Sequence, residues 1–177
     1  MATLDWYQTV FELIDLRSFS NLWYWIALAV LWSTSSHWIL GVPFDLVQRA
    51  SRYGGEAETD LNDLVRINVN RILYLMTSTG TGATGFIALV LAMLVTLGFF
   101  YSYEFAQATF FLVAPMSLIG ALNVWTARKI RATEAAGAAL YTLMWRHRRI
   151  VQGMGVVWIF VTGVWGMSRN MLVTGPF

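Results

Sequence analysis

Residues 83–125 read ATGFIALVLAMLVTLGFFYSYEFAQATFFLVAPMSLIGALNVW and contain a single charged residue, Glu104. The 21-residue runs on either side of it, 83–103 and 105–125, contain no Asp, Glu, Lys or Arg. A helix needs about 20 apolar residues to cross the hydrocarbon core of a bilayer. This stretch therefore predicts two membrane-spanning helices that form an antiparallel hairpin around a very short turn.

Two further runs, 22–42 and 150–168, are also free of Asp, Glu, Lys and Arg. Unbroken apolar runs of this length favour helices over a membrane barrel, whose strands alternate apolar and polar residues. We therefore predict an all-α polytopic membrane protein, a bundle of four transmembrane helices at about 22–42, 83–103, 105–125 and 150–168. Residues 1–177 are expected to form a single membrane domain.

The overall composition agrees with this class. Hydrophobic residues make up 57% of the chain, charged residues 12%, and the mean hydropathy is +0.56. A soluble domain of this size keeps too much of its surface in water to hide so many apolar side chains. The net charge of +2 is too small to indicate nucleic-acid binding, and the lack of Cys excludes disulfides and thiolate metal sites.

Ten of the twelve Lys and Arg residues lie in the two long connections between the predicted spans. They are Arg49, Arg52, Arg66 and Arg71 in the first connection, and Arg128, Lys129, Arg131, Arg146, Arg148 and Arg149 in the second. Basic residues accumulate on the cytoplasmic side of membrane proteins. The pattern therefore predicts that both long connections lie in the cytoplasm and that both termini lie on the other side of the membrane.

Outside the spans, two segments show helical amphipathic patterns. Residues 4–17 and 61–79 each place apolar side chains on one helix face, which predicts short helices lying on the membrane surface. Within the spans, Pro115 is expected to kink its helix. Trp32 and Trp158 fall near the middle of their spans and are expected to pack inside the bundle.

The 126–149 connection has a net charge of +5, from six basic residues and Glu134. Such a segment can bind anionic phospholipid headgroups at about 1 kcal/mol per basic residue. Orientation in the membrane explains the same charges without lipid recognition. We retain Arg128, Lys129, Arg131, Arg146, Arg148 and Arg149 as candidate lipid-binding residues.

Residues 80–85 read GTGATG and match the G-x-G-x-x-G pattern of dinucleotide-binding loops. That motif needs a preceding strand, whereas here an apolar span follows and no strand is expected before it. A bent beginning of the span, where small residues let another helix approach, fits better. The candidate helix-packing residues are Gly80, Gly82, Gly85, Gly155, Gly163 and Gly166.

No arrangement of side chains indicates catalysis. His37 and His147, the only histidines, fall toward the cytoplasmic ends of their spans and provide one possible haem-ligand pair. However, His147 lies in WRHRR (145–149), which is typical of a solvated segment. We expect the chain to ligate no cofactor or metal, so any associated lipid, quinone or pigment would be held by apolar and aromatic contacts.

Three stretches, residues 5–26, 32–45 and 63–71, resemble small, uncharacterised four-helix inner-membrane proteins of alphaproteobacteria. Some of these carry the label "component of SufBCD complex". The label implies iron–sulfur assembly, although this chain has no Cys for such a cluster. What the resemblance implies is a bacterial inner membrane rich in respiratory and photosynthetic assemblies, in which both termini are expected to lie in the periplasm. It transfers no catalytic residues.

The spans contain no Asp, Glu, Lys or Arg for a proton relay or ion coupling, so a self-contained pump is disfavoured. The leading hypothesis is a non-catalytic accessory subunit of a larger energy-converting complex, either a photosynthetic reaction-centre–antenna core or a respiratory complex. Its expected partners are other integral membrane subunits and phospholipid. The alternatives are the small membrane subunit of a tripartite secondary transporter and a haem or quinone enzyme.

Overall fold

The computed structural model describes residue 19 and residues 21–173 of the 177-residue chain. Its elements in order are α2 (Leu22–His37), β1 (Trp38–Ile39), β2 (Val42–Pro43), α3 (Phe44–Tyr53), α4 (Gly55–Val95), the π-helix η2 (Thr96–Phe100), α5 (Glu104–Thr133) and α6 (Gly137–Val173). The predicted all-α class is confirmed, with one short β-ribbon of two two-residue strands among the described residues. The predicted helix at 4–17 lies outside the described residues.

Among the described residues, three helical stretches are long and apolar enough to cross a membrane: Gly55–Phe100, Glu104–Thr133 and Gly137–Arg169. They contain most of the predicted spans 83–103, 105–125 and 150–168, but are longer. At 1.5 Å per residue, the 30 residues of α5 extend about 45 Å. Since a hydrocarbon core is about 30 Å thick, these helices are long enough to extend beyond that core.

The fourth predicted span, 22–42, is wrong at its C-terminal end. Helix α2 stops at His37, and its 16 residues extend only about 24 Å. A tight turn follows, in which Leu40 and Gly41 have φ of 54° and 75°, and Ile39 pairs with Val42. Two successive positive φ values are typical of a hairpin turn and cannot continue a right-handed helix.

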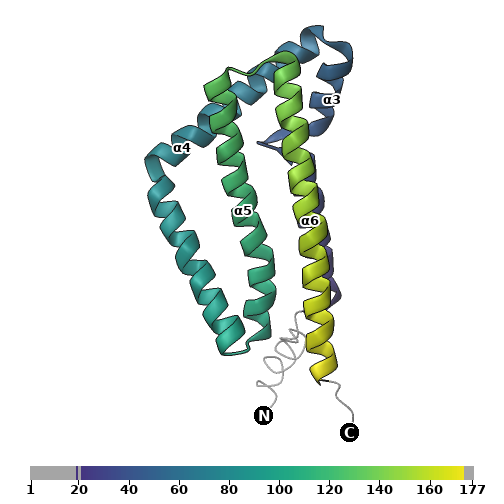
Figure 1. Cartoon of the computed structure of the whole chain (residues 1–177), viewed down its shortest axis with the longest axis vertical. Coiled ribbons are helices and arrows are strands. Elements are labelled where there is room, and N and C mark those ends of the chain that lie inside the picture. The colour runs from purple at the N-terminus through teal and green to yellow at the C-terminus, as the bar shows by residue number, and fades with distance from the viewer. Residues whose placement is uncertain (1–18, 20, 174–177) are drawn as a thin grey trace, which may run out of the picture.

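The prediction of a short separate helix at 61–79 is wrong, because these residues belong to the 41-residue helix α4 (Gly55–Val95), which continues through residues 80–85 without a break. Near its middle, α4 turns sharply (Figure 1). Thr77 and Ser78 both donate hydrogen bonds to the Tyr74 carbonyl at 2.9 Å. Such bonds from side chains back to the helix carbonyls, together with nearby glycines, explain a bend in this region.

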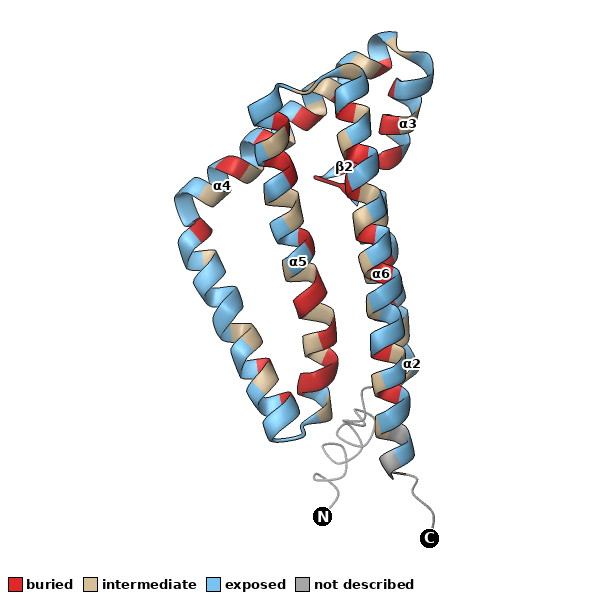
Figure 2. Cartoon of the chain, in the orientation of Figure 1, coloured by how far each residue is buried: buried red, intermediate tan, exposed pale blue. Residues whose placement is uncertain are grey.

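The largest core lies at one end of the molecule, in a unit that we call the head. The head consists of β1, β2, α3, the first half of α4, and the adjoining ends of α5 and α6 (Figure 2). Its fully buried side chains include Ile39, Val42, Val47, Leu61, Ala127, Leu140, Met144 and others. Sequence reasoning treated the two basic connections as links, and it missed that they pack against each other.

The amphipathic patterns explain the packing of the head. In α4, Leu61, Val65, Val69 and Leu73 recur every four residues and are all buried. This spacing keeps one helix face toward the core. The other face carries charged residues such as Arg66, so the first half of α4 presents its polar side to solvent.

Below the head, α2 packs beside α6 and α5 beside α6, around two smaller apolar clusters. Trp32 is 4% exposed within one of them, and Trp158 packs at its edge.

Pro115 in α5 has no N–H to donate, so the carbonyl of Phe111 loses its usual helical partner. The indole Nε1 of Trp158 donates to that carbonyl at 2.7 Å. Helix α6 thus satisfies the group that Pro115 leaves free.

Gly155 on α6 allows α2 to approach closely. A Cβ atom added to Gly155 would lie 2.9 Å from Cε3 of Trp32, closer than real contacts allow. We expect Gly155→Ala to lower the free energy of unfolding by about 1–3 kcal/mol, the usual cost of overpacking. The measurement is thermal unfolding of the purified protein in detergent, followed by circular dichroism.

Gly153→Ala on the same helix is the matched control. A Cβ at Gly153 meets no atom within 4 Å. This variant should be as stable as the unmodified protein or slightly more stable, because the helical conformation is about 1 kcal/mol more favourable for Ala than for Gly. Equal unfolding midpoints for the two variants would contradict the packing of Gly155 on Trp32.

Candidate functional site

A buried glutamine joins three elements at the end of the molecule opposite the head. Gln107 in α5 is 2% exposed, and its Nε2 donates to the Gly98 carbonyl of η2 at 2.6 Å. Its Oε1 accepts a hydrogen bond from Trp165 Nε1 of α6 at 3.0 Å. A Cβ at Gly98 would lie 3.0 Å from the Gln107 backbone nitrogen, so this approach depends on glycine.

Sequence reasoning missed this network. The available signal was an amide side chain inside the otherwise apolar run 105–125, where an unsatisfied polar group is costly. A π-helix is also a rare local feature that frequently marks functional sites. Here the amide donates one hydrogen bond and accepts one, both within the chain, which indicates a structural tie between α5, α6 and η2.

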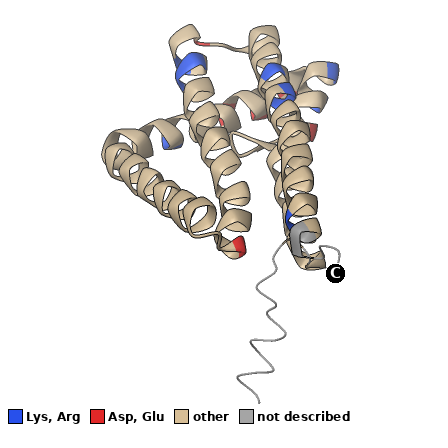
Figure 3. Cartoon of the chain, turned by 60° about the horizontal axis from the view of Figure 1, so that its bottom comes forward, with Lys and Arg blue, Asp and Glu red and all other residues tan. Residues whose placement is uncertain are grey.

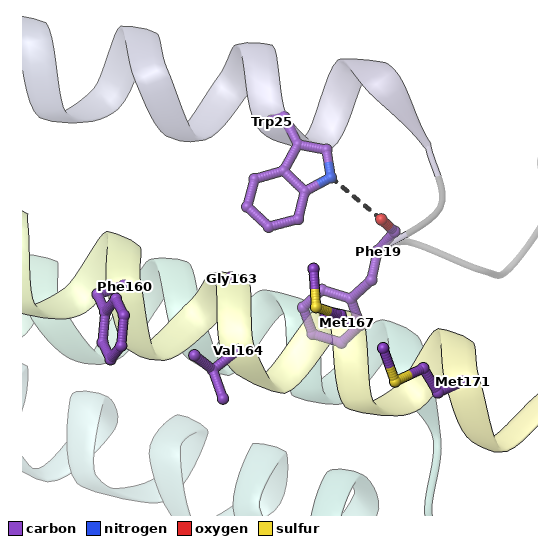
Figure 4. Close-up of a pocket in the computed structure, with 8 residues that line it drawn as sticks. Phe19, Trp25, Phe160, Gly163, Val164, Met167 and Met171 are labelled. Carbon is purple, nitrogen blue, oxygen red and sulfur yellow. Dashed lines mark hydrogen bonds between the residues drawn. The ribbon is translucent and has the colours of Figure 1, made fainter.

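An apolar groove of about 600 Å³ lies where α2 meets α6 (Figure 4). Figure 4 shows Phe19 and Trp25 on one side of it and α6 on the other, with Trp25 Nε1 donating to the Phe19 carbonyl at 3.1 Å. The lining residues on α6 are Phe160, Gly163, Val164, Gly166, Met167 and Met171. The flexible thioether side chains and aromatic rings suit an apolar occupant such as an acyl chain.

A second groove, of about 470 Å³, separates the second half of α4 from α5. Its lining residues are Met76, Ala83, Thr84, Ile87, Val113, Met116, Ser117, Gly120, Ala121 and Val124. Many of these side chains are small, and a Cβ at Gly120 would meet no atom within 4 Å. The backbones of both helices are therefore accessible to a group that enters the groove.

The structure divides the six candidate packing glycines into two kinds. A Cβ would lie 2.9 Å from the Trp32 ring at Gly155 and 3.2 Å from the Phe19 ring at Gly166, so Gly155 lies against α2 and Gly166 against Phe19, three residues before α2 begins. At Gly80 a Cβ would meet only Met76 of the same helix, at 3.5 Å. A Cβ at Gly82, Gly85 or Gly163 would meet no atom within 4 Å.

The six candidate lipid-binding residues lie along α5 and α6 where these helices enter the head, and Figure 3 shows Lys and Arg gathered in this part of the molecule. Arg148 is used inside the protein, because its guanidinium stacks on the Phe44 ring with Cζ 3.9 Å from the centroid. Arg131 donates to Asn70 Oδ1 at 2.9 Å. The exposed side chains without such a contact among the described residues are Arg128, Arg146 and Arg149.

The two histidines lie in different environments. His147 is 3% exposed, and its Nδ1 shares a 2.8 Å hydrogen bond with Thr126 Oγ1. The interpretation of residues 145–149 as fully solvated is therefore wrong at this position, because α5 covers the imidazole. His37 is exposed at the end of α2, beside Trp38. Within the described part of the chain, no group of three or more His, Cys, Asp or Glu residues is arranged to hold a metal ion.

No protein-family model, curated protein or solved structure matches this chain. The fold defines a class only, a helical protein in which three helices of the described residues are long and apolar enough to span a membrane. Beyond this class, the candidate sites are two apolar grooves and a basic surface.

The Gln107 network makes a prediction about stability. Gln107→Met keeps the size of the side chain but leaves the Gly98 carbonyl and the Trp165 indole without their partners. An unsatisfied buried polar group costs about 1–3 kcal/mol, so the unfolding midpoint in detergent should fall clearly. Thr109→Val on the same helix is the control, because among the described residues the Thr109 hydroxyl bonds only to the Phe105 carbonyl of its own helix. Equal midpoints for the two variants would show that the amide is not a structural tie.

Proposed function

We propose that this protein is a non-catalytic accessory subunit of a larger energy-converting complex in a bacterial inner membrane, such as a photosynthetic reaction-centre–antenna core or a respiratory complex. The observation that carries the proposal is the groove between the second half of α4 and α5. In the most apolar window of the helical stretch Gly55–Phe100, only 11% is buried within the chain. This half of α4 is free to contact other molecules along most of its surface (Figure 2).

A transmembrane helix of another subunit is the occupant that suits this groove. Lipid tails are as apolar as Leu, so helices associate in a bilayer through close packing and interhelical hydrogen bonds. Ala83, Gly120 and Ala121 allow a close approach of backbones. The hydroxyls of Thr84 and Ser117 donate to carbonyls of their own helices and retain lone pairs that accept a hydrogen bond from a neighbour.

The use of the polar side chains supports a role without catalysis. Gln107 and His147 bind other parts of the same chain, and Glu104 Oε1 accepts a hydrogen bond from the Phe19 backbone N–H at 2.9 Å. Each of these groups has a structural partner. The proposal therefore assigns to this chain the tasks of packing and positioning, with the chemistry performed by its partner subunits.

The groove is tested by filling it. Gly120→Leu adds bulk where the partner helix is proposed to approach, and it should abolish copurification of the partner after gentle detergent extraction with an affinity tag. Gly153→Leu is the matched control, since both glycines are helical and a Cβ at either meets nothing within 4 Å. Pigmented or respiratory core subunits recovered with the control but not with Gly120→Leu would support the proposal.

Other outcomes of the same experiment would contradict the proposal. A large permease as the copurifying protein would favour the alternative function, the small membrane subunit of a tripartite secondary transporter. A homogeneous monomer or homo-oligomer from the unmodified protein would exclude both functions. Equal recovery of the partner with Gly120→Leu and with the control would exclude this groove as the docking site.

We also propose that the head faces the cytoplasm and the termini face the periplasm, because ten basic residues belong to the two connections that form the head. The chain has no native Cys, so single cysteines report on sidedness without interference. Tyr103→Cys, at an exposed position in the α4–α5 turn, should react with an impermeant thiol reagent added outside the inner membrane. Arg52→Cys, exposed on the head, should react only after the membrane is opened. The opposite labelling would reverse the orientation.

A further inference from the structure

A cavity of about 450 Å³ lies in the head, between the first half of α4 and the link from α5 to α6. Its lining residues come from α4, from the end of α5, from Ala135 and Ala136 in the link, and from Leu140 of α6. It shares no lining residue with the α4–α5 groove or with the groove beside α2. Pockets that hold small ligands have volumes of roughly 300–1,000 Å³, so this cavity has room for one.

The floor of this cavity is apolar. Val65 and Val69 of α4, Ile130 of α5 and Leu140 of α6 line it, and all four side chains are buried in the core of the head. Such a floor can bind the apolar part of a ligand, because binding removes apolar surface from water. The four side chains are already fixed by the packing of three helices, so the floor is formed before a ligand arrives.

Polar groups surround this floor. Asn62, Arg66 and Asn70 line the cavity from α4 and recur every four residues, so they share one face of the helix. Arg131 and Glu134 line it from the end of α5. A mostly apolar cavity with a few polar groups is typical of small-ligand sites, in which the polar groups fix the orientation of the ligand.

Arg131 is the lining residue best prepared to bind an anion. Its Nη2 donates to Asn70 Oδ1 at 2.9 Å, which connects the two sides of the cavity and orients the guanidinium. A guanidinium carries several further N–H donors, and the amide nitrogen of Asn70 adds its own. Among the described residues, the bond to Asn70 is the hydrogen bond that the Arg131 side chain donates. Donors therefore remain at this point for a ligand.

The charges of the lining favour a ligand with one negative charge. Arg66 is already paired with Asp63, with Nη2 3.1 Å from Oδ1, so Arg131 is the cation that a ligand can use. Glu134 follows Arg131 by three residues, about one helical turn. Its carboxylate repels a second negative charge placed near it. A dianion is therefore disfavoured in this cavity.

We propose that this cavity binds a monocarboxylate with an apolar body, whose carboxylate contacts Arg131 and Asn70 while its body covers the apolar floor. Guanidinium and carboxylate groups form two parallel hydrogen bonds, which give geometric selectivity in addition to charge. Two sources offer this chemistry, a free organic acid and the C-terminal residue of a polypeptide with an apolar side chain. The cavity is separate from the α4–α5 groove, so the proposal stands independently of the partner subunit.

The test uses the full-length protein in a neutral detergent and hexanoate as the probe. Thermal unfolding is followed by circular dichroism at increasing hexanoate concentration, because a ligand that binds the folded state raises the unfolding midpoint. The control compounds are hexanamide, which lacks the charge, acetate, which lacks the apolar body, and adipate, which has a second carboxylate. Hexanoate should raise the midpoint more than each control at equal concentration. An equal effect of hexanoate and any one control would overturn the proposal.

Two variants place the effect at the cavity. Arg131→Gln should weaken hexanoate binding on the order of tenfold to a hundredfold, the usual effect of losing a hydrogen bond to a charged group. Arg128→Gln removes the same charge from an exposed position on α5 outside the lining, and it should bind hexanoate like the unmodified protein. Equal losses in both variants would indicate a diffuse charge effect and overturn the proposal. Unchanged binding in Arg131→Gln would exclude this site.

A further probe identifies the source of the carboxylate. The N-acetylated tripeptide Ala-Ala-Leu with a free C-terminus is compared with hexanoate, and its C-terminal amide is the control. Tighter binding of the peptide, lost in Arg131→Gln, would assign the cavity to the C-terminus of a polypeptide. Tighter binding of hexanoate would assign it to a free acid. If neither carboxylate raises the unfolding midpoint, the proposal is wrong.

Discussion

In hydrocarbon no water is available to a backbone carbonyl, so a helix that departs from regular geometry must find another donor within the protein. This constraint explains two contacts on which the bundle depends. Pro115 frees the Phe111 carbonyl, and Trp158 donates to it; the Gly98 carbonyl in the π-helix accepts from Gln107. Because Gln107 also accepts from Trp165, both irregularities connect α5 to α6. The irregular helical segments at Pro115 and Gly98 are therefore the places where hydrogen bonds join α5 to its neighbouring helices.

The molecule divides into a head with its own apolar core and a membrane-suited part with much less internal packing. In the head, α3 and the first half of α4 bury one face each, which is possible because water satisfies their polar faces. In the other part, the second half of α4 bends away and leaves a groove beside α5. The head buries its apolar side chains within the chain, whereas the apolar helices leave much of their surface available to neighbouring molecules. The proposed role as an accessory subunit follows from this division.

The bend in α4 has a consequence for the charge distribution. The first half of α4 runs across the ends of α5 and α6, so basic residues from both connections lie in one region (Figure 3). Some of these residues, such as Arg148 and Arg66, have partners inside the protein. Others remain exposed beside tryptophans. The bend in α4 thus both completes the core of the head and places exposed cations next to the apolar runs.

The sequence by itself determined the helical membrane class, the hairpin of the two runs between 83 and 125, and the amphipathic pattern at 61–79. These features depend on local length and periodicity, which are visible in any single stretch of chain. Only the tertiary structure decided that α2 ends at His37, that residues 61–79 continue into the next span, and that the basic connections form a packed head. It also decided which cations are used internally and which glycine meets Trp32. Those outcomes depend on contacts such as Thr126 with His147, or Gln107 with Trp165, between residues far apart in the chain and on different helices. No local pattern encodes such contacts, because they exist only once the helices have packed.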